Sequence, residues 1–253
     1  MVSARTTDLA RRLKTLHETE RPLVLPTVWD AWSARLAVDA GFVALTVGSH
    51  PLAEALGSGD GEQLAFSEVM IAVRRITNAV DVPVSVDLES GYGVAPAELV
   101  GGLLEAGGVG VNLEDTVHGE GGRLRTADEH AAFVGAVRGA ADDLGVPLVI
   151  NGRTDLFLHA EEQTDALLDD GIARLRALAD AGADSLYPVA IQDDERIAAL
   201  VQALPRPVNI TAFPDRDDLE RLTRLGVGRI SFGPRLQAAL AAQATAWLGR
   251  WRG

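Results

Sequence analysis

The sequence predicts one α/β domain over residues 1–253, a (β/α)8 TIM barrel with a helix before its first strand. Short apolar runs alternate with longer helical patterns about eight times along the chain. The runs are continuously apolar, which is typical of strands buried on both faces of a parallel sheet. Five helix–strand joints share one glycine-containing pattern. No G-x-G-x-x-G sequence follows the first strand, and this disfavours an open dinucleotide-binding sheet.

The elements can be assigned in order along the chain. The first twenty residues have the spacing of a polar amphipathic helix, and residues 127–144 and 165–181 show helical spacing between strands. The eight candidate strands are Leu23–Pro26, Val43–Val47, Val84–Val86, Val109–Leu113, Leu148–Asn151, Ser185–Tyr187, Val208–Thr211 and Arg229–Phe232.

The joints between helices and strands repeat one short pattern. A glycine just past a helix end adopts the left-handed conformation that stops the helix, and the β-branched run after it is the next strand. The five copies are DAGFVAL at 39–45, EAGGVGV at 105–111, DLGVPLV at 143–149, DAGADSL at 180–186 and RLGVGRI at 224–230.

The composition excludes several classes of partner. Lysine and arginine number 23 against 36 aspartates and glutamates, which gives a net charge of −13. Nucleic acid and anionic membranes are therefore not expected as partners, because both require a basic face. The sequence has no apolar membrane span and no signal peptide, so we expect a cytoplasmic protein.

Two residue types are almost absent. The chain has no cysteine, which excludes thiolate nucleophiles and cysteine–metal sites. Its single lysine, Lys14, lies in the N-terminal helix, so a Schiff-base aldolase and a Walker-type phosphate loop are excluded as well. Carboxylates, five histidines, two tyrosines, hydroxyls, arginines and a bound metal remain for chemistry.

Acidic residues gather where barrel active sites lie, at the carboxyl ends of the strands. Asp87 and Glu89 are two apart and should point to one side of the third strand's end, and Glu114 ends the neighbouring strand. Three converging carboxylates would repel one another, and Mg²⁺ or Mn²⁺ would relieve this. Arg153, across the mouth, could hold a substrate carboxylate in a forked pair. Metal and arginine together would stabilise an enolate beside a carboxylate.

Structural roles are the alternatives for several of these residues. Asp30, Asp115 and Asp155 each follow a strand and are expected to cap the next helix. Arg153 could be a structural partner of Asp155 or Glu114.

The five histidines divide into two groups. His17, His130 and His159 are expected on the surface of helices or outer turns. His50 and His118 lie in loops at the active end of the barrel, where either a catalytic or an incidental role is open.

Residues 87–93, DLESGYG, resemble the D-x-D-x-G-Y-G signature of the isocitrate lyase/phosphoenolpyruvate mutase superfamily. The similarity extends along almost the whole barrel, through residues 41–62, VNLEDT at 111–116, INGRTDLFL at 150–158 and ISFGPRL at 230–236. The resemblance implies a Mg²⁺-dependent enzyme that acts on 2-oxo or 2-hydroxy carboxylates. Its members cleave or form C–C or C–P bonds through a pyruvate-like enolate.

The resemblance also implies roles for individual residues. Carried over, Asp87, Glu89 and Glu114 form the metal shell, and Asp60 is a loop acid near the metal. The substrate carboxylate is held by Arg153 and by the turn Gly48-Ser49-His50, and Asn209 at the end of the seventh strand is a further expected substrate-binding residue.

The sequence departs from the family pattern in two places. Glu89 stands where the motif has its second aspartate. The loop 116–125, TVHGEGGRLR, has neither the cysteine of the lyases nor the lysine of the phosphonate mutases, so isocitrate lyase, methylisocitrate lyase and phosphoenolpyruvate mutase activities are not expected. Its glycines at 119, 121 and 122 indicate a flexible lid whose closing groups would be His118, Arg123 and Arg125, and a surface loop without a role in the site is the alternative.

The predicted function is a Mg²⁺- or Mn²⁺-dependent lyase, decarboxylase or hydrolase of a small 2-oxo or 2-hydroxy carboxylate. Tyr92, His118 and Arg153 are the expected catalytic residues, with His50, Tyr187 or a metal-bound water as other sources of acid or base. Ketopantoate-type hydroxymethyl transfer and a barrel that binds a carboxylate metabolite without turnover are the alternatives.

The last helix predicts an assembly. Residues 236–251, LQAALAAQATAWLGRW, are apolar around much of a helix. We expect this helix to pack on a neighbouring subunit of a homodimer or homotetramer. The resemblance implies the same, because members of that superfamily exchange C-terminal helices. A last helix packed entirely on its own barrel is the alternative.

Overall fold

The computed structural model of the chain describes residues 2–19 and 21–252. It contains the predicted parallel strands in the predicted order, with bounds that differ by a few residues. They are β1 (Leu23–Leu25), β2 (Thr27–Val28), β3 (Leu45–Val47), β4 (Val84–Asp87), β5 (Gly110–Leu113), β8 (Val149–Thr154), β9 (Ser185–Pro188), β10 (Asn209–Thr211) and β11 (Arg229–Ser231).

The strands form a barrel of two hydrogen-bonded sheets rather than one continuous ladder. One sheet has the order β2-β3-β4-β5-β8-β9 and the other β1-β11-β10, and every pair within them is parallel. At one seam, a parallel bridge joins Leu186 to Val208. At the other, β1 and β2 are consecutive and are separated only by Pro26, which lacks the N–H that a ladder needs. The α/β barrel prediction is confirmed.

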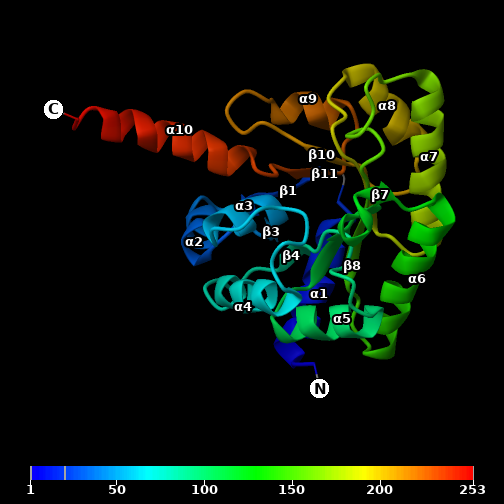
Figure 1. Cartoon of the computed structure of the whole chain (residues 1–253), viewed down its shortest axis with the longest axis horizontal. Helices are drawn as coiled ribbons and strands as arrows, with labels where there is room; N and C mark the ends of the chain where they lie inside the picture. The colour runs from blue at the N-terminus through cyan, green and yellow to red at the C-terminus, as the bar shows by residue number, and fades with distance from the viewer. Residues whose placement is uncertain (1, 20, 253) are drawn as a thin grey trace.

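The helices surround the strands on the outside (Figure 1). In Figure 1, α10 extends away from all other elements toward the C-terminus. The helices are α1 (Ala4–Leu16), α2 (Ala31–Asp39), α3 (Ser49–Ala55), α4 (Phe66–Thr77), α5 (Pro96–Glu105), α6 (Ala127–Asp143), α7 (Asp165–Asp180), α8 (Asp194–Ala203), α9 (Leu219–Arg224) and α10 (Arg235–Gly249). In the described part of the chain, no helix is both long and apolar enough to cross a membrane.

The glycine joints predicted from the sequence are confirmed. The five glycines just past α2, α5, α6, α7 and α9 all have positive φ, between 67° and 103°. A side chain would be strained there, so glycine ends each helix and releases the chain into the next strand.

The barrel interior contains polar side chains in addition to the apolar core. Arg229 is fully buried and donates to Asn112 Oδ1 at 3.0 Å and to His17 Nε2 at 3.3 Å. His17 in turn donates from Nδ1 to the Leu13 carbonyl at 2.8 Å. The expectation that His17 lies on the surface is therefore wrong, because α1 closes the amino-terminal end of the barrel and carries His17 inside.

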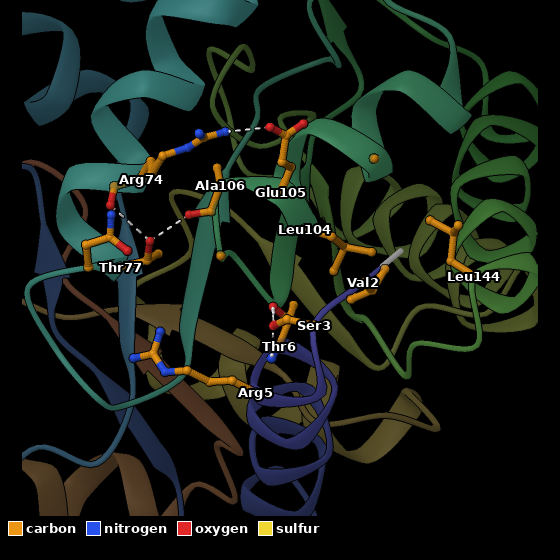
Figure 2. A pocket seen from close by; sticks show the side chains of 13 residues that line it. Val2, Ser3, Arg5, Thr6, Arg74, Thr77, Leu104, Glu105, Ala106 and Leu144 are labelled. Carbon is orange, nitrogen blue, oxygen red and sulfur yellow. Dashed lines mark hydrogen bonds and ion pairs between the residues drawn. The ribbon is translucent and has the colours of Figure 1, made fainter.

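That end of the barrel also holds a cavity of about 580 Å³, beside the start of α1 (Figure 2). Several of its polar groups are already paired: Arg74 contacts Glu105 at 2.9 Å, and the Thr77 hydroxyl donates to the Ala106 carbonyl at 2.6 Å. Because the carboxyl ends of the strands are at the opposite end, this cavity is separate from the acidic cluster described below.

The loop expected to be a flexible lid is a short antiparallel hairpin. Its strands are β6 (Thr116–Val117) and β7 (Arg123–Leu124), joined by the 3-10 turn η1 (His118–Glu120). Gly121 and Gly122 have φ of 73° and 77° and provide the reversal. The glycines that suggested flexibility therefore form a defined turn.

Candidate active site

The signature acids lie together because β4, β5 and β8 are adjacent and in register. Asp87 pairs with Asn112, and Asn112 pairs with Asn151. Glu114 follows the end of β5 and Arg153 lies at the end of β8, so both reach the same rim as Asp87. Glu89 is in the turn after β4.

Glu62 holds this turn in an unusual backbone conformation. Glu89 and Tyr92 have φ of 48° and 55°, values that side chains other than glycine rarely adopt. Glu62 Oε1 accepts from Ser90 N at 3.0 Å, Ser90 Oγ at 2.7 Å and Tyr92 N at 2.8 Å. The Glu62 amide also donates to Glu89 Oε2 at 2.8 Å. Sequence reasoning missed Glu62, whose only signal was its place beside Asp60 in the loop after α3.

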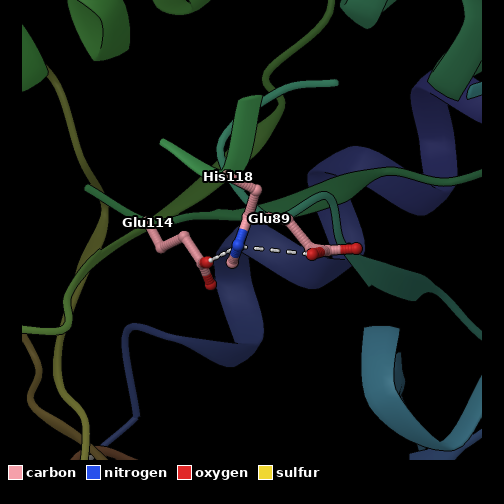
Figure 3. A group of neighbouring side chains, drawn as sticks. All are labelled: Glu89, Glu114 and His118. Atoms are coloured by element: carbon pink, nitrogen blue, oxygen red, sulfur yellow. Dashed lines mark hydrogen bonds and ion pairs between the residues drawn. The ribbon is translucent and has the colours of Figure 1, made fainter. Parts of the chain in front are cut away.

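His118 joins two of the predicted metal ligands (Figure 3). Its Nε2 lies 2.7 Å from Glu114 Oε1 and 3.4 Å from Glu89 Oε2. The second oxygen of Glu89, Oε1, accepts from the Tyr92 hydroxyl at 2.7 Å. Of the three expected closing groups, only His118 enters the cluster.

The other two closing groups point elsewhere. Arg123 pairs on the surface with Glu120 and Glu129. Arg125 donates to the backbone carbonyls of Ser90 and Glu114 and so braces the site from behind. The hairpin therefore contributes one imidazole, and the expectation for the two arginines is wrong.

Arg153 is the central cation of the site. Its Nη1 contacts Glu114 Oε2 at 2.7 Å and Asp87 Oδ2 at 3.5 Å, and its Nε donates to Asp155 Oδ1 at 2.6 Å. Within the described residues, Nη2 donates no hydrogen bond. Arg153 thus has the structural contacts expected from the sequence and still has one nitrogen for a ligand.

Two of the three expected helix caps are wrong. Asp30 caps α2, accepting from Ser33 N at 2.7 Å. Asp115 instead accepts from the Thr154 hydroxyl and the Asp155 amide, and Asp155 accepts from the Thr116 hydroxyl as well as from Arg153. Both carboxylates are buried, and they tie the ends of β5 and β8 together where the sequence pattern indicated only a cap.

Burial raises the pKa of the three signature carboxyls. It raises the pKa of Glu114 to about 8 and that of Glu89 to about 7, and it raises the pKa of Asp87 as well. The hydrogen bond to Glu114 raises the pKa of His118 to about 9. Arg153 and His118 thus compensate the negative charge only in part, and a further cation would stabilise the ionised carboxylates.

The donor set fits a divalent cation. Glu89, Glu114 and His118 each offer one ligand atom, and these atoms lie within 4.8 Å of one another. Carboxylate oxygens suit Mg²⁺ and Mn²⁺, and imidazole suits Mn²⁺ and the later transition ions. Asp87 faces the same group across Arg153.

The remaining predicted site residues lie at different distances from this cluster. Ser49 Oγ is 3.5 Å from Asp87 Oδ2, where α3 begins after Gly48. His50 and Asp60 pair with each other at 3.4 Å and are half-exposed at the rim. Asn209 is fully buried and contacts Ser231 and Asn151, which places it in the barrel interior rather than among the acids.

Of the two other histidines expected on the surface, the prediction is correct for His159 and wrong for His130. His159 is exposed and contacts the Thr116 hydroxyl at 3.2 Å. His130 is buried, and its Nε2 donates to the Arg153 carbonyl at 3.0 Å. The prediction for His130 is therefore wrong, because α6 turns this residue inward behind Arg153.

Comparison with known proteins decides the family. The phosphoenolpyruvate phosphomutase family model matches residues 13–249. The chain belongs to the phosphoenolpyruvate phosphomutase family. The resemblance stated from the DLESGYG signature is thereby confirmed.

Relatives in this family have enzymatic names. An oxaloacetate decarboxylase of Bradyrhizobium sp. (strain BTAi1) is 32% identical over 241 residues, covering 92% of this chain and 81% of the relative. A 2-methylisocitrate lyase of Bacillus subtilis (strain 168) is 29% identical over 216 residues, covering 81% and 68%. The family member described here is accordingly an enzyme of the lyase and decarboxylase type.

Solved structures of the family agree in fold. A candidate phosphonomutase from Burkholderia cenocepacia J2315 superposes with a TM-score of 0.90 at 43% identity, covering 96% of this chain and 99% of that chain. An oxaloacetate acetylhydrolase in complex with the product oxalate superposes with a TM-score of 0.84 at 26% identity, covering 96% and 86%.

Proposed function

We propose that this phosphomutase-family enzyme is a divalent-metal-dependent decarboxylase of a small 2-oxo dicarboxylate such as oxaloacetate. In this reaction the C3–C4 bond breaks, CO2 leaves, and the electron pair remains as an enolate that a proton quenches at C3. A cation held by Asp87, Glu89 and Glu114 would polarise the substrate's oxo and carboxylate oxygens and favour the enolate. Decarboxylation is one of the lyase, decarboxylase and hydrolase reactions predicted from the sequence.

The observation that carries the proposal is that the two tyrosines and His118, the neutral acid/base candidates nearest the cluster, are all engaged by other side chains. Tyr92 donates its hydroxyl proton to Glu89, and burial raises its pKa. Tyr187 pairs with the Thr211 hydroxyl, and burial raises its pKa as well. His118 is engaged by two carboxylates. Cleaving a hydroxy acid requires a base at the hydroxyl, whereas decarboxylating a 2-oxo acid does not.

The chain's own residues fit the other requirements. The Nη2 atom of Arg153, together with the Gly48-Ser49 turn, would hold the substrate carboxylate that does not leave as CO2 and remains in the product. Tyr92 is a protonated phenol at the cluster and is the group we propose for protonating C3. The names of the relatives support the same reaction, since oxaloacetate decarboxylases are among them.

Pyruvate formation from oxaloacetate tests the proposal directly. The assay compares Mg²⁺, Mn²⁺ and excess EDTA, with metal-only blanks subtracted because free cations also promote this decarboxylation. We expect turnover with metal, its loss with EDTA, and a fall of about 100-fold or more in kcat/KM for Arg153→Lys, whose ammonium cannot span the same partners. No rate above the blanks, or a dependence on a folate carrier, would contradict the proposal.

Substrate selectivity is the second arm of the same test. Because the chain has no cysteine, iodoacetamide should leave turnover unchanged. Isocitrate and 2-methylisocitrate should yield no product above background. Robust glyoxylate release from isocitrate would favour a C–C lyase with a base that the structure does not identify.

A further inference from the structure

His118 has the geometry of a ligand rather than of a surface residue. Its Nε2 lies 2.7 Å from Glu114 Oε1 and 3.4 Å from Glu89 Oε2, and both carboxylates are buried. The imidazole side chain itself is 26% exposed. Figure 3 shows the ring entering the space between the two glutamates.

The surrounding backbone fixes the ring in this position. The hairpin β6–β7 presents His118 from one side, and Gly61 borders it on the other. A Cβ at Gly61 would lie 3.2 Å from His118 Nδ1, and Gly61 has a φ of +85°. The bare glycine therefore leaves space for the imidazole, and any larger residue at position 61 would crowd it.

The two carboxylates are oriented by other contacts and leave oxygens facing His118. Glu114 gives Oε2 to Arg153 and Oε1 to His118. Glu89 Oε1 accepts a hydrogen bond from the Tyr92 hydroxyl. Glu89 Oε2 accepts one from the Glu62 amide and also lies 3.4 Å from His118 Nε2. Two oxygens and one nitrogen thus converge from two segments of the chain, the turn after β4 and residues 114–118.

We infer that His118 Nε2 is a direct ligand of the divalent cation, together with Glu89 and Glu114, and that the proton which Nε2 shares with Glu114 is released to solvent when the cation binds. This inference rests on the metal dependence in the proposed function. An imidazole ligand is uncommon for Mg²⁺ and suits Mn²⁺, Fe²⁺, Co²⁺ and Zn²⁺. The site should therefore prefer a transition ion over Mg²⁺. His118 would then be unavailable as acid or base, because the ion uses the nitrogen that faces the site.

Pulsed EPR on the full-length protein loaded with Mn²⁺ tests this assignment without any turnover. We expect ¹⁴N modulation from a directly bound imidazole, which changes to the ¹⁵N pattern in protein grown with ¹⁵N-histidine. His118→Ala should lose the modulation, and His50→Ala, which removes the other loop histidine of this end, should keep it. Circular dichroism and melting temperature establish that both variants fold.

Metal affinity provides the second readout. Direct titration should give Mn²⁺ a Kd at least about tenfold below that of Mg²⁺ in the wild-type protein. His118→Ala should raise the Kd for Mn²⁺ by about 10- to 100-fold and change that for Mg²⁺ by less than about threefold. A second variant, His118→Gln, retains a polar side chain and should resemble His118→Ala.

Each contrary result has a distinct meaning. Mn²⁺ binding without nitrogen modulation, or modulation that survives in His118→Ala, overturns the assignment of His118 and leaves the decarboxylase proposal standing. Absence of Mn²⁺ binding overturns the assignment as well. Nitrogen coupling without oxaloacetate turnover keeps the assignment and removes the proposed reaction.

Discussion

Glu62 binds three donors of the signature turn through a single carboxylate oxygen. Its replacement by alanine would leave two backbone amides and a hydroxyl without their acceptor, and the left-handed conformations of Glu89 and Tyr92 would lose their restraint. We expect Glu62→Ala to lower the free energy of unfolding by about 2 kcal/mol. We also expect kcat/KM to fall at least about tenfold, because Glu89 and Tyr92 would be displaced.

Urea unfolding and steady-state kinetics check this prediction together. Glu54→Ala, which removes an exposed glutamate of α3, is the matched control and should change stability by less than about 0.5 kcal/mol. Wild-type kinetics in Glu62→Ala would show that the signature turn holds its shape without this carboxylate.

The metal ligands are tested one residue at a time as well. Asp87→Ala should abolish Mg²⁺ and Mn²⁺ binding in calorimetry while the melting temperature stays near the wild-type value, since Asp87 lies at the end of β4 and outside the apolar core. An unchanged metal affinity in this variant would remove Asp87 from the site.

His17 links α1 to the barrel interior and makes stability depend on pH. Burial lowers its pKa from 6.5 to about 4, with Arg229 of β11 adding to the decrease and Asp184 opposing it. Below about pH 6.5 the unfolded chain takes up a proton that the folded chain accepts only near pH 4. Stability should therefore fall as the pH decreases, by about 2 kcal/mol from this group between pH 7 and pH 5.

The measurement is the free energy of unfolding at both pH values for the wild type and His17→Gln. His130 has a similarly lowered pKa and contributes to both proteins, so the difference between them isolates His17. An identical loss in the two proteins would mean that His17 is not buried neutral.

The hairpin β6–β7 is predicted to serve the site more than the fold. Replacing residues 117–123 with a short Gly-Ser link removes His118 and only exposed or half-buried neighbours. We expect a loss of metal affinity and kcat/KM comparable to that of His118→Ala, with a shift of only a few degrees in the melting temperature. Full kcat/KM in the shortened protein would make the hairpin a simple connection.

Local patterns predicted the elements well and their side-chain partners poorly. The helix-ending glycines and the buried strands depend on neighbours within a few residues, so periodicity located them. Glu62 contacts residues 28 and 30 positions away, and Arg229 contacts His17 across 212 positions. Such contacts are set by which helix face turns inward, and the sequence of one chain does not specify this for His17, His130 or Asp115.

At the scale of the whole molecule, α10 packs on its own barrel near its start, where Leu236 and Leu240 contact the core, whereas residues 241–250 are all exposed. None of its residues is buried, and near its end Trp247, Leu248 and Trp251 are 58%, 70% and 89% exposed. The wall of the barrel has a groove of about 200 Å³, and side chains from β1, α9 and β11 contribute to its largely apolar lining, which includes Val24, Phe42, Phe213, Leu219, Leu222, Ile230 and Phe232. We propose that α10 of a second copy covers apolar surface of this kind in a homodimer or homotetramer.

Light scattering at micromolar concentration checks the assembly. The wild-type protein should have a mass of two or four times 26.7 kDa. The double variant Trp247→Glu, Leu248→Glu places two charges on the exposed apolar end of α10 and should lower the mass to 26.7 kDa, because burying unpaired charges is costly. Leu144→Glu puts a charge on an exposed leucine at the end of α6 and should retain the wild-type mass. A wild-type mass of 26.7 kDa would refute the oligomer, and the exposed Trp247 and Trp251 would then need a different partner.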